Sequence, residues 1–278
     1  MARIAEIFEG LRARGGRAVM PFVTAGDPVA DGLGAVLAGL ERGGASVVEV
    51  GLPFTDPIAD GPVIQASMQR ALDRGVTVGQ TLAQVRAVRG RLSIGLVAMV
   101  SYSIVHRRGL QRFVDEAVAA GFDGFIFPDL SLEAAGPAQE ACAAAGATLS
   151  LLVAPNTPMD RARDIAAAST GFVYVLARSG VTGARAALPA DLPARLAGLR
   201  EVTDLPLAVG FGVSTAEQVA SVTAVADAAI VGSAMVDRLL HAGEDTGDGA
   251  SAVGAAAEAF TRELASGLPQ AAGAPAGA

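Results

Sequence analysis

The sequence predicts an α/β fold: a single (β/α)8 TIM barrel with an extra N-terminal helix. Short apolar runs alternate with alanine-rich segments of helical spacing, the runs number eight, and together they fill about 250 residues, the usual size of such a barrel. The length of 278 residues would also suit two small domains. The runs predicted to be strands cover residues 19–23, 47–50, 94–100, 125–127, 148–153, 172–176, 207–209 and 228–231.

Helical segments separate these strands. Leu33, Val36, Leu37 and Leu40 recur at helical spacing, and the pattern ends at a pair of glycines, a common helix end. Residues 4–14 carry an apolar stripe and predict the extra helix, which we expect to plug the N-terminal end of the barrel. The predicted domain boundaries are 1–267 for the barrel and 268–278 for a disordered tail rich in Pro and Gly.

An open doubly wound sheet is the alternative fold. It usually has fewer strands and carries a glycine-rich nucleotide fingerprint near its first strand. Residues 24–28, which follow the first predicted strand, read Thr-Ala-Gly-Asp-Pro and lack that fingerprint. The barrel is therefore the favoured prediction.

Composition argues against several classes of protein. A net charge of −7 disfavours a nucleic-acid surface, which needs clustered Lys and Arg. No stretch resembles a membrane span or a secretory signal, so we expect a cytoplasmic protein. A single cysteine, Cys142, excludes an internal disulfide framework and is expected to be buried on a helix. No spacing of potential ligands matches a metal site, and His106 and His241 are expected at the surface.

Glu49 lies within the second predicted strand. Successive side chains of a strand point to opposite faces, so Val48 and Val50 share one face while Val47, Glu49 and Gly51 share the other. Both faces of a barrel strand are covered, which predicts that Glu49 is buried. A buried carboxylate needs a partner or acquires a raised pKa, and no Lys or Arg lies between residues 43 and 70 to form a salt bridge. We therefore interpret Glu49 as a functional carboxyl.

Two further acids, Asp56 and Asp60, follow on the next loop, where Pro53 and Pro57 restrict the backbone. In a barrel of this kind the chemistry lies at the C-terminal ends of the strands and in the loops after them. Carboxyl groups in unlike environments can divide acid and base roles, and the drier group has the higher pKa. This loop is therefore a candidate catalytic segment.

Three late strand ends contain glycine, in residues 179–183, 210–214 and 232–234. Glycine lets backbone N–H groups approach an anion, and such barrels commonly bind phosphate after their seventh and eighth strands. These glycines could instead only turn the chain, but their adjacency in a barrel favours a phosphate site. The Gly-Phe-Gly of residues 210–212 lacks the third glycine of a dinucleotide motif.

The two tyrosines, Tyr102 and Tyr174, fall at or near the ends of the third and sixth predicted strands. Aromatic packing in the core is one explanation. Their position favours another, in which they form walls of a pocket and their hydroxyls are available for hydrogen bonds.

These motifs together resemble the tryptophan synthase alpha subunit family. The resemblance runs from the N-terminal helix to about residue 240, and residues 48–65, which read VEVGLPFTDPIADGPVIQ, carry most of it. Shorter matching motifs are residues 127–130 (FPDL), 179–183 (SGVTG), 210–212 (GFG) and 232–234 (GSA). The resemblance implies a (β/α)8 barrel that cleaves indole-3-glycerol phosphate to indole and glyceraldehyde 3-phosphate, with no cofactor of its own. It also implies a partner, a pyridoxal-phosphate-dependent beta subunit that joins indole to serine.

The resemblance implies catalytic roles for Glu49 and Asp60 and puts Tyr174 near the glutamate. It puts Thr182 on a mobile loop that closes over Asp60. The residues implied at the substrate phosphate are Gly183, Phe211, Gly212, Gly232 and Ser233.

The chemistry of this cleavage agrees with the two acids. The reaction needs a proton at indole C3, an acceptor for the ring N–H, and removal of the side-chain hydroxyl proton as the carbon–carbon bond breaks. A carboxyl in an apolar strand can give a proton and take one back, which suits Glu49. A more exposed carboxylate stays ionised, which suits Asp60 at the indole nitrogen.

Two departures from the family pattern concern the partner. Most relatives carry Tyr-Asn-Pro after the third strand, whereas this chain has Tyr102-Ser103-Ile104. Most continue Pro-Asp-Leu-Pro after the fourth strand, whereas this chain has Ser131 in the last position. The family places this region at the beta subunit, so we expect weaker coupling to such a partner.

Two other functions stay open at this point. One is a stand-alone indole-3-glycerol-phosphate lyase that releases free indole, for example for secondary metabolism. The other is a non-catalytic barrel that activates a beta subunit, against which the intact Glu49 and Asp60 argue.

Overall fold

The computed structural model describes residues 3–55, 57, 60–177, 188–210, 212–244 and 249–269, except for the side chain of Glu244. All strand pairs in this part of the chain are parallel, and the strand order is β5-β4-β3-β2-β1-β9-β8-β7-β6. The strands are β1 (Ala18–Thr24), β2 (Val47–Gly51), β3 (Gly95–Met99), β4 (Gly124–Ile126), β5 (Thr148–Leu149), β6 (Leu152–Val153), β7 (Val173–Leu176), β8 (Leu207–Gly210) and β9 (Ala228–Val231).

The fifth predicted strand, residues 148–153, is interrupted and forms both β5 and β6. Its first half pairs with β4 and its second half with β7, so the two edges of the sheet meet at Ser150 and Leu151. There the amide of Ser150 donates to the carbonyl of Phe125 at 3.0 Å, and the amide of Tyr174 donates to the carbonyl of Leu151 at 3.1 Å. The sheet therefore closes into the predicted eight-position barrel.

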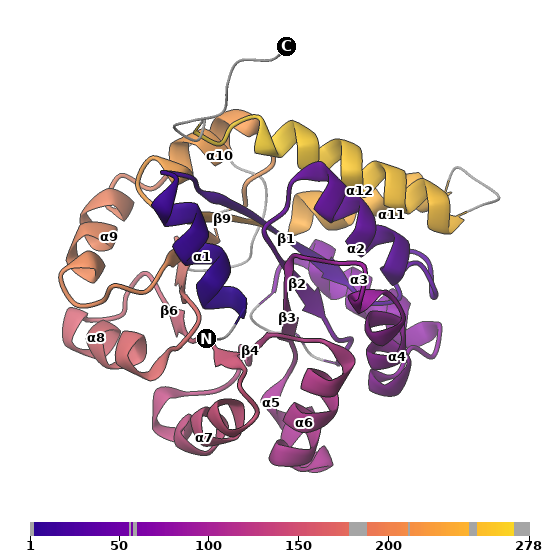
Figure 1. Ribbon diagram of the computed structural model, residues 1–278, viewed down its shortest axis with the longest axis horizontal. Helices are drawn as coiled ribbons and strands as arrows, with labels where there is room; N and C mark the ends of the chain where they lie inside the picture. The colour runs from indigo at the N-terminus through magenta and orange to yellow at the C-terminus, as the bar shows by residue number, and fades with distance from the viewer. Residues whose placement is uncertain are drawn as a thin grey trace.

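Helices form a ring around this barrel, and the long α12 packs against α2 and α11 (Figure 1). Two helices follow β2 and two follow β3, whereas the alternating strand and helix pattern of the sequence predicted one helix after each strand. The described helices are α1 (Arg3–Ala13), α2 (Leu33–Gly43), α3 (Pro62–Asp73), α4 (Val78–Arg89), α5 (Tyr102–Arg108), α6 (Leu110–Ala120), α7 (Gly136–Ala144), α8 (Met159–Ala168), α9 (Leu192–Arg200), α10 (Ala216–Thr223), α11 (Ser233–Glu244) and α12 (Gly249–Ala265), with the short 3-10 helix η1 (Leu132–Ala134).

The two faces of β2 belong to two different cores. Val48 and Val50 join the core between the sheet and the outer helices, whereas Val47 joins the core inside the barrel. The parallel register places Phe22 of β1 and Val97 of β3 on either side of Glu49, and both belong to the inner core. The predicted alternation along β2 is thus confirmed, and it directs Glu49 into the barrel.

The helix α1 closes the N-terminal end of the barrel. Its buried residues Ile4, Phe8 and Leu11 belong to the inner core, and the ring of Phe8 lies 6.1 Å from that of Phe172, just before β7. In Figure 1 this helix lies across the strands, inside the ring of outer helices. The expected extra helix is therefore confirmed, together with its position as a plug.

The end of the chain is described as far as Pro269. The amide of Leu268 donates to the carbonyl of Ala265 at 3.0 Å, and the Leu268 side chain packs against the outer core. The remaining residues of the expected tail, 270–278, lie outside the described part. None of the helices described above has the length and apolar character needed to cross a membrane.

The contact between α1 and β3 gives a first prediction. A Cβ added at Gly95 would lie 2.5 Å from Ile4 Cδ1, so Gly95→Ala is expected to destabilise the fold by about 1–3 kcal/mol through overpacking. Ile4→Val removes that methyl group and alone should cost about 0.5–1.5 kcal/mol. The double variant should be more stable than Gly95→Ala alone, which chemical denaturation of all four proteins would measure. Simple additivity of the two losses would show that the helix does not seat against this strand as described.

Candidate active site

A cavity opens at the C-terminal ends of the barrel strands, where such folds carry their chemistry. It brings together Glu49 of β2, Tyr174 of β7 and Asp60 of the β2–α3 loop. Three more predicted residues line it from the β8 and β9 ends: Gly212, Gly232 and Ser233. The rest of its wall is mainly apolar and consists of Phe22, Ile64, Met99, Pro128, Leu152, Leu176, Gly210 and Ile230.

Glu49 is fully buried within this wall. Neither oxygen of its carboxyl group has a hydrogen-bond partner within the described part of the chain. Burial raises the pKa of Glu49 well above its ordinary value, and the negative charge of Asp60 raises it further. The structure therefore confirms the prediction that Glu49 is buried, and it shows no salt bridge to this residue within the described part of the chain.

Asp60 is half-buried, and its Oδ2 atom is shielded from solvent with no hydrogen-bond partner among the described residues. Burial raises the pKa of Asp60 to about 6. At neutral pH this carboxyl is still about nine-tenths ionised, although it is less exposed than the sequence suggested. Glu49 is the more deeply buried of the two groups, so burial favours its protonated form more strongly.

Tyr174 completes this end of the cavity. Burial raises the pKa of its hydroxyl well above the ordinary value, with smaller contributions from the charges of Glu49 and Asp60, so the hydroxyl keeps its proton. The ring extends over the end of β8, where a Cβ at Gly210 would lie 3.0 Å from both Cε1 and Oη of Tyr174. Because Gly210 has no side chain, the end of β8 leaves room for the Tyr174 ring.

The Gly212 and Ser233 end of the cavity has the features of an anion site. The backbone φ of Gly212 is 79°, a left-handed conformation that disfavours other residues. Ser233 is the first residue of α11, and a helix N-terminus favours a bound anion. The buried Oγ atom of Ser233 has no hydrogen-bond partner among the described residues.

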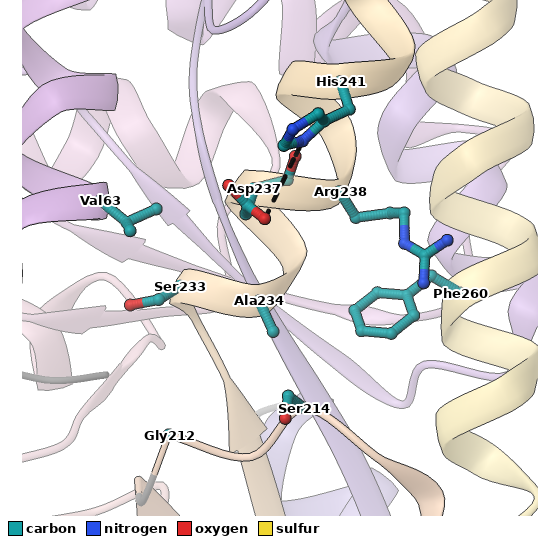
Figure 2. A pocket seen from close by; sticks show the side chains of 9 residues that line it. All are labelled: Val63, Gly212, Ser214, Ser233, Ala234, Asp237, Arg238, His241 and Phe260. Atoms are coloured by element: carbon teal, nitrogen blue, oxygen red, sulfur yellow. Dashed lines mark hydrogen bonds and ion pairs between the residues drawn. The ribbon is translucent and has the colours of Figure 1, made fainter. Parts of the chain in front are cut away.

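The same two residues also line a second, outer cavity of about 560 Å³ (Figure 2). Figure 2 shows Ser233, Asp237 and His241 along α11, with Gly212 and Ser214 on the chain segment near the start of that helix. The Arg238 guanidinium stacks 4.8 Å from the centre of the Phe260 ring. The proposed phosphate position thus lies where the inner and outer cavities adjoin.

Tyr102 lies apart from the other predicted site residues. It is the first residue of α5, its ring packs 5.7 Å from Phe127 and 6.2 Å from His106, and it contacts the outer core. Four other candidates, Asp56, Thr182, Gly183 and Phe211, lie outside the described residues.

Other potential reactive groups are not part of this site. Cys142 is buried on α7, as expected, and burial raises the pKa of its thiol to about 12. His106 and His241 are exposed, as expected. Within the described ranges no three His, Cys, Asp or Glu side chains come close enough to hold a metal ion.

Comparison with known proteins decides the family. The family model for the tryptophan synthase alpha chain matches residues 8–265. The chain belongs to the tryptophan synthase alpha chain family. It is 44% identical to the tryptophan synthase alpha chain of Rhodopirellula baltica over 265 residues, which cover 93% of this chain and 94% of the relative. It is 45% identical to that of Chloroflexus aggregans over 240 residues, covering 86% and 90% of the two chains.

Solved structures of tryptophan synthase share the fold. A Mycobacterium tuberculosis tryptophan synthase structure superposes with a TM-score of 0.85 at 33% identity, covering 96% of this chain and 98% of the other. The alpha subunit from Legionella pneumophila superposes with a TM-score of 0.84 at 32% identity, covering 95% and 98%. The (β/α)8 barrel and the family resemblance inferred from sequence are therefore both confirmed.

The anion end of this alpha-chain cavity gives a second prediction. Gly212→Val would fill the space beside Ser233 and force a branched side chain into a left-handed conformation, so glycerol phosphate binding should weaken at least about tenfold. Gly15→Val is a matched control, because Gly15 has a φ of 68° and open space around its Cβ position, remote from the cavity. Calorimetric titration would measure both. Unchanged affinity in the Gly212 variant would remove this residue from the phosphate site.

Proposed function

We propose that Glu49 and Asp60 divide the acid–base chemistry by which this chain cleaves indole-3-glycerol phosphate to indole and glyceraldehyde 3-phosphate. Membership of the tryptophan synthase alpha chain family makes the protein a lyase of this substrate in tryptophan biosynthesis. The proposal rests on one observation. The buried carboxyl of Glu49 has no hydrogen-bond partner among the described residues and lies with Asp60 in a mainly apolar cavity at the strand ends.

Glu49 acts first as the acid and then as the base. Its raised pKa keeps it protonated when the substrate binds, so it can donate its proton to C3 of the indole ring. The resulting carboxylate then removes the proton of the adjacent side-chain hydroxyl. The carbon–carbon bond breaks, its electron pair returns to the ring, and an aldehyde forms. Glu49 ends the cycle protonated, as it began.

Asp60 serves the ring nitrogen. Its carboxylate, mostly ionised at pH 7, accepts the indole N–H proton while C3 is protonated and returns it when the ring becomes aromatic again. The hydroxyl of Tyr174 stays protonated in the same cavity and is available to orient either carboxyl. Both acids therefore return to their starting states, and protons balance over the cycle.

The sequence also excludes one other route to carbon–carbon cleavage. An aldolase that forms a Schiff base needs a lysine amine, and the 278 residues contain no lysine. Acid–base catalysis by carboxyl groups is thus the route that this chain can supply from its own side chains.

The family implies a beta-subunit partner, and we propose that coupling to it is weak here. The loops after β3 and β4 are tied to each other, because Ser101 Oγ donates to Asp129 Oδ2 and the amide of Tyr102 donates to Asp129 Oδ1, both at 2.7 Å. Ser103 Oγ lies 2.7 Å from Ser101 Oγ and so belongs to the same network. The loop is held within this chain, which supports cleavage without a partner.

The acid role of Glu49 gives a third prediction. Glu49→Gln should lower turnover by about 10² to 10⁴-fold, because the amide cannot donate and recover a proton. The same change should stabilise the fold. The folded pKa of Glu49 exceeds its unfolded value, so wild-type stability falls as pH rises above about 4.5, whereas glutamine does not titrate.

Thermal unfolding at pH 4 and pH 8 tests the second part. At pH 8 the variant should melt at least about 2 °C higher than wild type, the shift that about 1 kcal/mol produces in a domain of this size. At pH 4 the difference should vanish, because Glu49 is then protonated in both states. A variant that keeps wild-type turnover would show that Glu49 is structural.

Titration with a purified beta subunit gives a fourth prediction. Activation of cleavage should be weaker than in a relative carrying Tyr-Asn-Pro after the third strand, by about 1–2 kcal/mol of coupling. Ser103→Asn restores the amide and should recover part of the activation without changing the basal rate. Strong stimulation of the wild type at stoichiometric partner would instead support a fully coupled synthase and refute the stand-alone alternative.

A further inference from the structure

The side chain of Gln65 forms hydrogen bonds to both ends of the turn that carries Asp60. The amide of Asp60 donates to the carbonyl of Pro57 at 3.0 Å and closes the turn. The side-chain amide of Gln65 then donates to the carbonyl of Asp60 at 2.8 Å and to the carbonyl of Pro57 at 3.3 Å. The side-chain NH₂ group of Gln65 thus binds the backbone at both Pro57 and Asp60, and Asp60 lines the cavity.

The helix that carries Gln65 is itself firmly attached to the barrel. Ser67 Oγ lies 2.6 Å from Thr24 Oγ1 at the end of β1, in a fully buried contact. One turn later, Arg70 binds both oxygens of Asp27 at 2.7 and 2.8 Å, and Arg74 binds Asp27 at 3.0 Å. These contacts fix the middle and the C-terminal end of α3 relative to β1. Gln65, in the first turn of the same helix, extends from it to the Asp60 turn.

We propose that Gln65 is a positioning residue for catalysis, which holds Asp60 at the indole nitrogen by clamping the backbone of its turn. The inference rests on the proposed role of Asp60. Gln65 does not itself line the described cavity, and its side chain is exposed. Gln65 is the last residue of the family motif of residues 48–65, but the sequence alone gave it no role.

Loss of the clip should let the turn move outward and admit water to the Asp60 carboxyl. Burial is what raises the pKa of Asp60, so hydration should lower that pKa toward its ordinary value. The titratable groups that face Asp60 from other elements are Glu49 of β2 and Tyr174 of β7. Asp56, on the same loop, lies outside the described residues.

The experiment compares two helix positions one turn apart. Gln65→Met and Gln65→Glu remove the donor at nearly constant side-chain length, and the carboxylate of the second also repels both carbonyls. Gln69→Met and Gln69→Glu are the matched controls, because Gln69 lies on the same exposed helix surface and donates to Asp73 Oδ1 at 2.7 Å instead of to the Asp60 turn. Each protein is assayed for indole release from indole-3-glycerol phosphate as a function of pH, with thermal unfolding alongside.

We expect both Gln65 variants to lose about 10- to 100-fold in kcat, the penalty for a catalytic group displaced by about 1 Å, with KM changed less than about threefold. In Gln65→Met the acidic limb of the pH profile should move below its wild-type position near pH 6. The added carboxylate of Gln65→Glu raises the pKa of Asp60 and opposes this shift, so that variant tests kcat and KM alone. Both Gln69 variants should match wild type in kcat, KM and pH profile. Wild-type kinetics in the Gln65 variants, equal losses in the Gln69 variants, or a loss explained by unfolding at the assay temperature would each overturn the inference.

A double-variant comparison separates this inference from the proposed function. Asp60→Asn alone should abolish most activity, and adding Gln65→Met should cost no more, because the clip has no carboxylate left to position. Full activity in Asp60→Asn would refute the proposed role of Asp60. Alternatively, Asp60→Asn has low activity, and adding Gln65→Met lowers it by the same factor as in the wild type. That result would leave the role of Asp60 intact and refute the positioning role of Gln65.

Discussion

The carboxyl group of Glu49 lies in a layer of apolar side chains that offers no counter-charge to its ionised form. Strand register fixes Phe22 and Val97 beside it, and the absence of a side chain at Gly51 makes room for the Phe22 ring, whose Cζ would lie 2.5 Å from a Cβ there. The pKa of this acid is therefore a property of how the barrel interior packs. The same strand register thus places both inner-core side chains and the acid that we propose as proton donor.

The first strand supports both carboxyls that we propose as catalytic. Phe22 of β1 shields Glu49, Thr24 at its end bonds to α3, and Asp27 just beyond it holds two arginines of the same helix. The side chain of Asp27 is only 1% exposed, so this ion pair is well shielded from solvent on the acidic side. The sheet thus fixes Glu49 directly, because Glu49 lies on β2. Asp60 is fixed indirectly, through α3 and the side-chain amide of Gln65 that binds its turn. The position of Asp60 therefore depends on more contacts than that of Glu49.

The apolar runs of the sequence predicted the strands. The alternation of side chains along a strand predicted the two faces of β2 and the burial of Glu49. It could not predict the break at Ser150 and Leu151, because hydrogen bonding to two different neighbours leaves no mark on an apolar run. It placed Tyr102 at or near a strand end, but it did not show that this residue begins α5 and packs its ring against Phe127. The degree of exposure of Asp60 depends on packing around its loop and was likewise beyond the sequence pattern.

The pairing of β1 with β9 also bears on how the chain is made. The edge of Ala18–Thr24 that faces Ala228–Val231 stays unpaired until more than two hundred further residues have left the ribosome. The helix α12, which packs on α2 across Gly39 and Gly254, is made later still. An open parallel edge is a template for association with other chains. The nascent protein therefore carries an aggregation-prone edge through most of its synthesis and loses it only when its last strand arrives.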